Sequence, residues 1–136
     1  MLTPNEIERT MYQFVKASAL GKAIGGDVYR RNKRPSGSGD EDIVLWHSAG
    51  IDDQIQTGIV RLNIYTAPRV RDNTNTNDEA RCGALERLFY DMLETGAAQT
   101  GVAMRTDGSP RVDYDLDAKQ FVIACRIRYQ YLNLDY

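Results

Sequence analysis

Two stretches of the chain carry hydrophobic residues at helical spacing. The first contains Ile7, Met11 and Phe14 on one face and opens at Thr3, where a T-x-x-E pattern with proline at its second position is typical of a helix capping box. We expect this helix to continue through residues 20–24. The second helix is expected to begin near residues 77–78 and to end at Gly96. Its apolar face consists of Cys82, Leu85, Leu88, Phe89, Met92 and Leu93.

Alternating apolar and polar positions predict the strands. The closing strand, residues 121–131, has one apolar and one largely polar face, which is typical of an antiparallel sheet. A second long strand is predicted over residues 54–66. Its apolar positions change parity at Gly58, so we expect a β-bulge there that turns both apolar groups toward one core. Shorter strands are expected at 27–31, 43–46, 102–105 and 111–115, with a turn at 49–53.

Two polar segments separate these elements. Residues 32–42 and 67–77 are rich in Pro, Gly, Ser, Asn and charged residues, and both are expected to be mobile surface loops. The order is helix, three strands, helix and two or three strands. We therefore predict a single α+β domain over residues 1–136, with two helices packed on one face of a mainly antiparallel sheet of about four to six strands.

Composition narrows the range of functions. The chain has 136 residues, enough for one domain, with 17 basic and 19 acidic residues. A net charge of −2 argues against a dedicated nucleic-acid binder, which normally carries an excess of Lys and Arg. The sequence shows neither a signal peptide nor an apolar run long enough to span a membrane. We expect a protein made in the cytoplasm.

Candidates for catalysis are few. His47 is the single histidine, and no second His, Cys or Glu lies near it in the sequence, so we interpret it as a surface residue at a strand end. No G-x-S-x-G motif marks a nucleophilic serine. These observations predict a protein that is not an enzyme.

Metal and cofactor sites are equally unsupported. Cys82 and Cys125 occupy apolar positions and are expected in the core. The alternating acids of residues 113–117 resemble the opening of a calcium loop. That loop needs Gly at its sixth and Glu at its twelfth position, where this chain has Ala118 and Ala124. We expect an acidic turn there and no metal or cofactor.

Charged and aromatic residues in the loops and at the C-terminus remain as candidates for subunit contacts. The basic clusters are followed closely by acids, so solvated and self-compensated loop charges are the alternative interpretation. Tyrosine is common in interfaces because it combines apolar area with a polar tip. The subunit-interface candidates are Arg30, Arg31, Lys33, Arg34, Asp52, Asp53, Arg69, Arg71, Tyr131 and Tyr136.

The order of the expected elements resembles that of the tail terminator and tail completion family of long-tailed bacteriophages. The local sequence is also similar to proteins of phage structural modules over residues 3–7, 15–20 and 53–65. This resemblance implies a structural virion protein that forms a homo-oligomeric ring, typically of six subunits. Such a ring caps the tail tube and joins it to the head connector. The implied partners are further copies of the chain, the tail tube protein and connector proteins, with possible non-specific contact to DNA in the lumen.

Two alternatives remain open at the level of the sequence. The chain could be another head–tail adaptor, neck or tail-like-apparatus subunit. It could also be a small enzyme or ligand-binding domain, for which a deep pocket with converging polar groups would be the sign.

Overall fold

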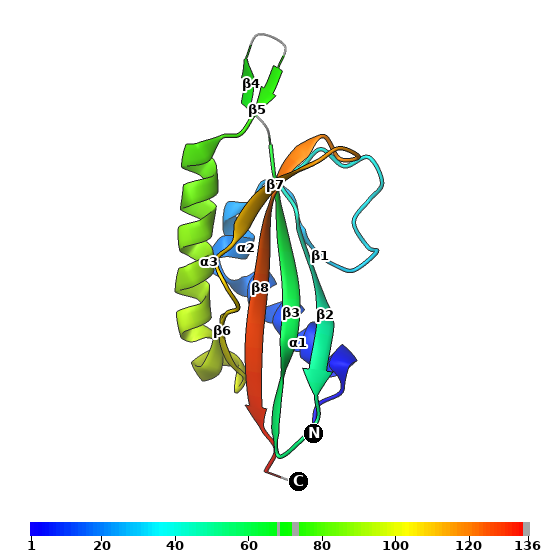
Figure 1. Ribbon diagram of the computed structural model, residues 1–136, viewed down its shortest axis with the longest axis vertical. Helices are drawn as coiled ribbons and strands as arrows, with labels where there is room; N and C mark the ends of the chain where they lie inside the picture. Colours follow the sequence, from blue (N-terminus) through cyan, green and yellow to red (C-terminus); the bar gives the residue numbers. More distant parts are fainter. Residues whose placement is uncertain (68, 72–73, 135–136) are drawn as a thin grey trace.

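The structure is a computed structural model that describes residues 1–67, 69–71 and 74–134. The described part contains three helices and eight strands (Figure 1). In chain order these are α1 (Pro4–Ala17), α2 (Ala19–Ala23), β1 (Val28–Arg30), β2 (Ile43–Ile51), β3 (Ile55–Thr66), β4 (Arg69–Arg71), β5 (Thr74–Thr76), α3 (Glu79–Thr100), β6 (Ala103–Thr106), β7 (Arg111–Asp115) and β8 (Gln120–Leu132). The predicted α+β class is confirmed.

The N-terminal helix starts as the sequence predicts and ends earlier. The Thr3 hydroxyl accepts from the Glu6 amide at 3.1 Å and the Glu6 carboxylate accepts from the Thr3 amide at 3.2 Å, which completes the capping box. The expected continuation is wrong, because Ser18 adopts an extended backbone and its side chain caps the separate helix α2. A Cβ at Gly21 would lie 2.2 Å from the Val15 carbonyl oxygen, so only glycine fits this tight junction.

Helix α3 runs further than the sequence predicts. Asp78 caps its first turn by accepting from the Arg81 amide at 3.2 Å. Gly96 does not end the helix. Instead it lies against the Met104 side chain of β6, where a Cβ would come within 2.3 Å of the sulfur. The helix ends at Thr100, and the residue that follows, Gly101, has a φ of 76°, the left-handed conformation common just after helix C-termini.

The strands form one mixed sheet and one separate hairpin. The main sheet has the order β1-β2-β3-β8-β6. Strand β7 pairs with the same edge of β8 as β6 does, but with the first half of β8, while β6 pairs with the second half. The pair β1–β2 is parallel and the others are antiparallel. The long central pair β3–β8 extends from Ile55 opposite Leu132 to Thr66 opposite Phe121. A mainly antiparallel sheet of six strands is therefore present, as predicted.

The predicted bulge at Gly58 is wrong. The register between β3 and β8 is continuous through Gly58, and the shift lies in β2 between His47 and Ala49. Ile59 and Val60 consequently point to opposite faces of the sheet, since successive side chains of a regular strand alternate. Strand β2 is also longer than expected, because Ala49–Ile51 pair with β3 where a turn was predicted.

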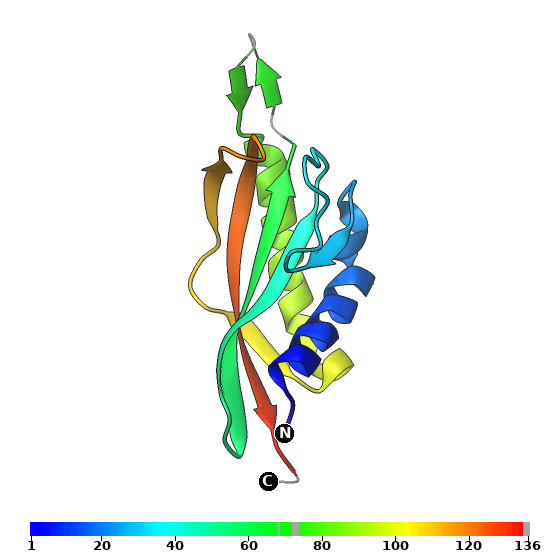
Figure 2. The ribbon, with the colours of Figure 1, turned by 90° about the vertical axis from the view of Figure 1, so that its right-hand side faces the viewer.

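All three helices cover the same face of the sheet (Figures 1 and 2). The core between the layers includes Val15, Leu45, Leu62, Phe89 and Ile127, all fully buried. The opposite face of the sheet carries no helix within the described part of the chain. We call this the open face.

The segment expected to be a loop over residues 67–77 contains regular structure. Strands β4 and β5 pair antiparallel with Arg69 opposite Thr76, and this hairpin projects beyond one end of the main sheet (Figure 2). Threonine favours strands, which gives this polar segment a β-preference despite its lack of apolar periodicity. Residues 68 and 72–73, and the side chains of Arg69 and Arg71, lie outside what the structure describes.

Candidate assembly surfaces

Arg30, a predicted interface residue, is bound within the subunit. Its Nε donates to Glu8 of α1 at 2.7 Å, its guanidinium forms an ion pair with the same carboxylate, and it also donates to Asn5. The second oxygen of Glu8 accepts from the His47 amide of β2 at 2.9 Å. Glu8 thus ties helix α1 to two neighbouring strands at the sheet edge.

Arg34 lies at the centre of a buried polar cluster. Its Nε donates to Asp42 at 2.8 Å, its Nη2 donates to Gln120 at 2.7 Å, and its guanidinium carbon lies 3.9 Å from the centre of the Tyr65 ring. Asp42 is 1% exposed and also accepts from Ser38 at 2.7 Å. The base of the segment 32–42 is therefore packed against the sheet, where the sequence predicted an unpacked loop. Its predicted mobility stays a prediction.

The pKa of Asp42 reflects this environment. Burial acts to raise it, but hydrogen bonds from Arg34, the Asp27 amide and Ser38, together with the Arg34 charge, prevail and hold the pKa below its ordinary value. The carboxylate is consequently charged in the folded protein at neutral pH. Because Arg30 and Arg34 are both engaged within the subunit, Arg31 and Lys33 are the exposed members of this basic cluster.

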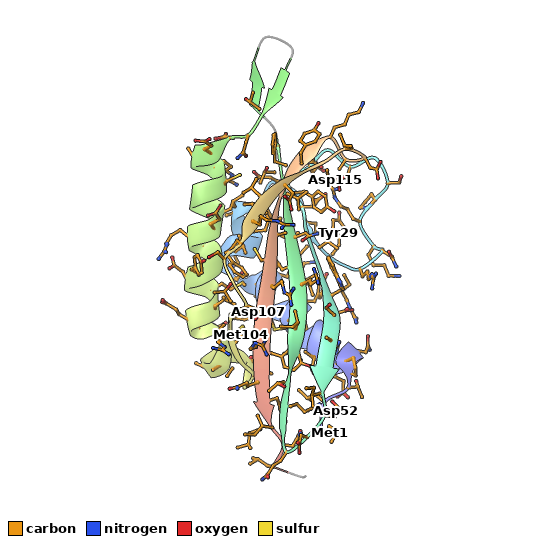
Figure 3. All side chains as sticks on the ribbon, in the orientation of Figure 1. Met1, Tyr29, Asp52, Met104, Asp107 and Asp115 are labelled. Carbon is orange, nitrogen blue, oxygen red and sulfur yellow. The ribbon has the colours of Figure 1, made fainter. Side chains whose placement is uncertain are left out.

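Asp52 and Asp53 lie at the tip of the β2–β3 hairpin, where Figure 3 shows Asp52 close to Met1, and the Asp53 carbonyl accepts from the Asn133 side chain that follows β8. The Asp52 carboxylate accepts from Nε2 of the Gln56 side chain at 2.8 Å. The buried Gln56 side chain also donates to the Leu2 carbonyl and accepts from the Leu2 amide, both at 2.8 Å. This residue pins the start of the chain to β3 and sets the position of α1.

Large apolar side chains are exposed at the same end. Ile51, Ile55, Leu132 and Leu134 are between 54% and 86% exposed, and Ile55 and Leu132 are direct cross-strand neighbours. We call these four residues the apolar tip. Contiguous exposed apolar side chains are typical of surfaces that bind another protein. Tyr131 is half-buried beside them, and Tyr136 lies outside the described residues.

The open face carries a set of arginines that the sequence analysis missed. Arg61 of β3 lies directly opposite Arg126 of β8, and Arg128 of β8 lies directly opposite Arg105 of β6. Arg111 of β7 faces the same side, opposite Ala124. We call these five residues the arginine row. The alternation of Arg126 and Arg128 on the polar face of the closing strand was visible in the sequence, but the pairing that aligns them with Arg61 and Arg105 was not.

Two acids accompany the arginine row. Asp107 accepts from Arg128 and forms an ion pair with Arg126, both at 3.1 Å, and Asp113 pairs with Arg111 at 3.1 Å. Figure 3 shows Asp107 beside the sheet next to β6 and β8. A shallow depression of about 230 Å³ lies among Arg61, Arg111 and Arg126 and is lined by polar groups, including Asn63 and Ser109. The row therefore keeps a surplus of positive charge on a solvent-accessible surface.

His47 is not the surface strand-end residue that the sequence predicted. It lies within β2 on the helix-covered face, and its Nε2 is hydrogen-bonded to the buried Tyr129 hydroxyl at 2.8 Å. Burial lowers the pKa of His47, although the nearby Glu8 and Asp52 charges oppose this, and burial raises the pKa of Tyr129. Both shifts favour the neutral forms of the pair.

The cysteines and the acidic turn have structural roles. Cys82 and Cys125 are buried in the core, as predicted, and burial raises the pKa of Cys125 to about 12. The Asp115 carboxylate accepts from the amides of Asp117 and Ala118 at 2.9 and 3.1 Å and so closes the β7–β8 turn. Within the described ranges, no cluster of three His, Cys, Asp or Glu side chains could hold a metal ion.

Helix α3, the longest helix in the described chain, is too polar to cross a membrane, and no other described helix is long and apolar enough to do so.

Compared with known proteins, the chain matches no protein-family model and no curated protein.

Proposed function

We propose that this chain is a structural subunit of a bacteriophage tail, a tail terminator or tail completion protein that works by assembly and catalyses no reaction. In this proposal several copies form a ring, of six subunits as the resemblance implies, that caps the tail tube and meets the head connector. The protein is then part of the virion at the junction of tail and neck.

The observation that carries the proposal is the apolar tip. Ile51, Ile55, Leu132 and Leu134 leave large aliphatic surface in water at one end of the molecule. Burying such area removes roughly 25 cal/mol of unfavourable free energy per Å², so a partner surface at this end is strongly favoured. A ring that stacks on a tube needs an axial contact of this kind on every subunit.

A genetic experiment tests the proposed function. The gene is deleted from the phage or prophage that encodes it, and the particles are examined by electron microscopy with gold-labelled antibody to the chain in the parent. We expect filled heads and separate tails after deletion, and label at the head–tail junction of the parent particle. Normal, infectious particles without the chain would overturn the proposal. Label that stays on heads after tails are detached would favour a head–tail adaptor instead.

A further inference from the structure

The arginine row places like charges directly opposite each other. Arg61 faces Arg126, and Arg105 faces Arg128, on adjacent strand pairs of the open face. Such cross-strand pairs of like charge destabilise a sheet. Asp107 compensates Arg126 and Arg128, while Arg61 and Arg105 lie exposed at the two sides of this group. The subunit thus retains an arrangement that an acidic partner would stabilise.

Helix α3 presents the opposite charge on the other layer of the molecule. Its solvent-facing side carries Glu79, Asp91 and Glu94, and the half-buried Glu86 lies at the edge of that side; we call these four residues the acidic stripe. Arg87 is the exposed base among them and pairs with Asp91 at 3.7 Å. Arg81 is engaged elsewhere, since it donates to both oxygens of Glu41. The helix surface therefore has an excess of negative charge.

We infer that the arginine row of one subunit binds the acidic stripe of a second copy of the same chain. This inference deepens the proposed function, on which it rests, by naming the lateral contact between ring subunits. The two surfaces lie on different layers, the open sheet face and the helical layer, so one copy can bind a neighbour on each side (Figure 2). Such a head-to-tail contact generates a ring when its rotation closes.

A second copy fits these surfaces better than nucleic acid does. The chain as a whole carries a net charge of −2, and the acidic stripe repels a polyanion that approaches the helical layer. The stripe is also a ready source of carboxylates for arginine, which binds them with directed hydrogen bonds. The contact is therefore expected to weaken at high ionic strength, because exposed charges are screened by salt.

Two charge-reversed variants test the contact. The row variant carries Arg61→Glu and Arg105→Glu, and the stripe variant carries Glu86→Lys and Glu94→Lys. The row variant also replaces both like-charge pairs by opposite pairs, so its urea unfolding midpoint should rise above that of the wild type. A loss of assembly in this variant could then not be due to misfolding. The matched control for the row variant is Arg9→Glu with Lys119→Glu, which changes the net charge by the same amount at exposed positions outside both surfaces.

The readout is sedimentation velocity and native mass spectrometry of each protein and of an equimolar mixture. We expect the wild type and the control to assemble, each reversed variant alone to lose assembly, and the mixture to regain it through swapped charges. If both reversed variants assemble like the wild type, the contact is wrong while the ring proposal stands. If the mixture is not rescued, or the wild type binds duplex DNA without self-association, the inference is also overturned. If the mixture regains assembly but gene deletion leaves normal particles, the contact is supported and the proposed tail function is contradicted.

Discussion

The Tyr129 hydroxyl and Nε2 of His47 lie 2.8 Å apart across strand β3, and two glycines make room for this contact. Gly58 lies between Tyr129 on β8 and Gly50 on β2 in the pairing register. A Cβ at Gly58 would lie 2.5 Å from the tyrosine hydroxyl oxygen and 2.3 Å from the Ala49 carbonyl oxygen. The glycine at position 58 therefore reflects the close passage of a tyrosine side chain.

Substitution of Gly58 by alanine should destabilise the protein. The added methyl meets backbone and ring atoms in a packed region, and overpacking of this kind typically costs roughly 1–3 kcal/mol of unfolding free energy. The measurement is urea unfolding followed by circular dichroism. Gly83→Ala is the matched control, because a Cβ there would meet nothing within 4 Å apart from the adjoining backbone of its own helix, α3. That change should stabilise the protein by up to about 1 kcal/mol, and equal effects at both sites would contradict the packing described for Gly58.

The His47–Tyr129 pair should make stability depend on pH. Burial lowers the pKa of His47 in the folded state, so the unfolded chain takes up a proton more readily. The free energy of unfolding is then expected to fall as pH drops through the unfolded-state pKa of about 6.5, and to be fully retained above it.

His47→Gln keeps a polar side chain at this position and removes the titration. The difference in unfolding free energy between wild type and variant, measured from pH 8 to pH 5.5, should decrease toward acid. A difference that is constant with pH would show that His47 does not titrate differently on folding.

The Arg34–Asp42 ion pair should contribute strongly to stability. Arg34→Met leaves the Asp42 carboxylate buried without its cation, and breaking a buried pair in this way typically costs about 3–5 kcal/mol. Arg111→Met is the control, because its pair with Asp113 is largely exposed and such pairs contribute roughly 0–1 kcal/mol. Chemical denaturation of both variants gives the comparison. A small effect at Arg34 would mean that the segment 32–42 is not anchored through this cluster.

The apolar tip should matter for assembly and hardly for folding. Ile55→Ser with Leu132→Ser removes exposed side chains, so the unfolding free energy should change by about 0.5 kcal/mol or less per site. The fraction of joined heads and tails in complemented deletion lysates should drop sharply. Leu116→Ser is the control, because Leu116 is a still more exposed aliphatic side chain, at the β7–β8 turn and so outside the apolar tip. An equal drop in the fraction of joined heads and tails for the tip variant and the Leu116 variant would show that the apolar tip has no specific role in head–tail joining.

Local patterns predicted most of the fold and little of the candidate surfaces. The capping box at Thr3 and the alternation in β8 depend on neighbouring residues, so they were readable in the sequence. The hydrogen bond between Tyr129 and His47 joins residues 82 positions apart and depends on the strand register. The interpretation of Gly58 as a bulge failed for the same reason, since the close approach that requires glycine comes from another strand.

The charged residues show the same limit. Arg30 and Arg34 belong to one basic cluster in the sequence, which predicts a contact with a neighbouring subunit, yet each binds a partner within its own subunit. Arg61, Arg105 and Arg126 are far apart in sequence, and the pairing of β3, β8 and β6 brings them together on the open face. Only the tertiary structure shows which charged residues form contacts within the subunit and which remain exposed to a neighbour.

The central claim is that this chain functions as one subunit of a ring, and the mass of the native assembly tests it most directly. Native mass spectrometry of the purified protein over a range of concentrations, with electron microscopy of the same sample, gives both stoichiometry and shape. The account predicts a closed oligomer with an open central pore, whose population falls as salt is raised. A protein that remains monomeric at its highest attainable concentration, alone and in the presence of tail tubes, would contradict it.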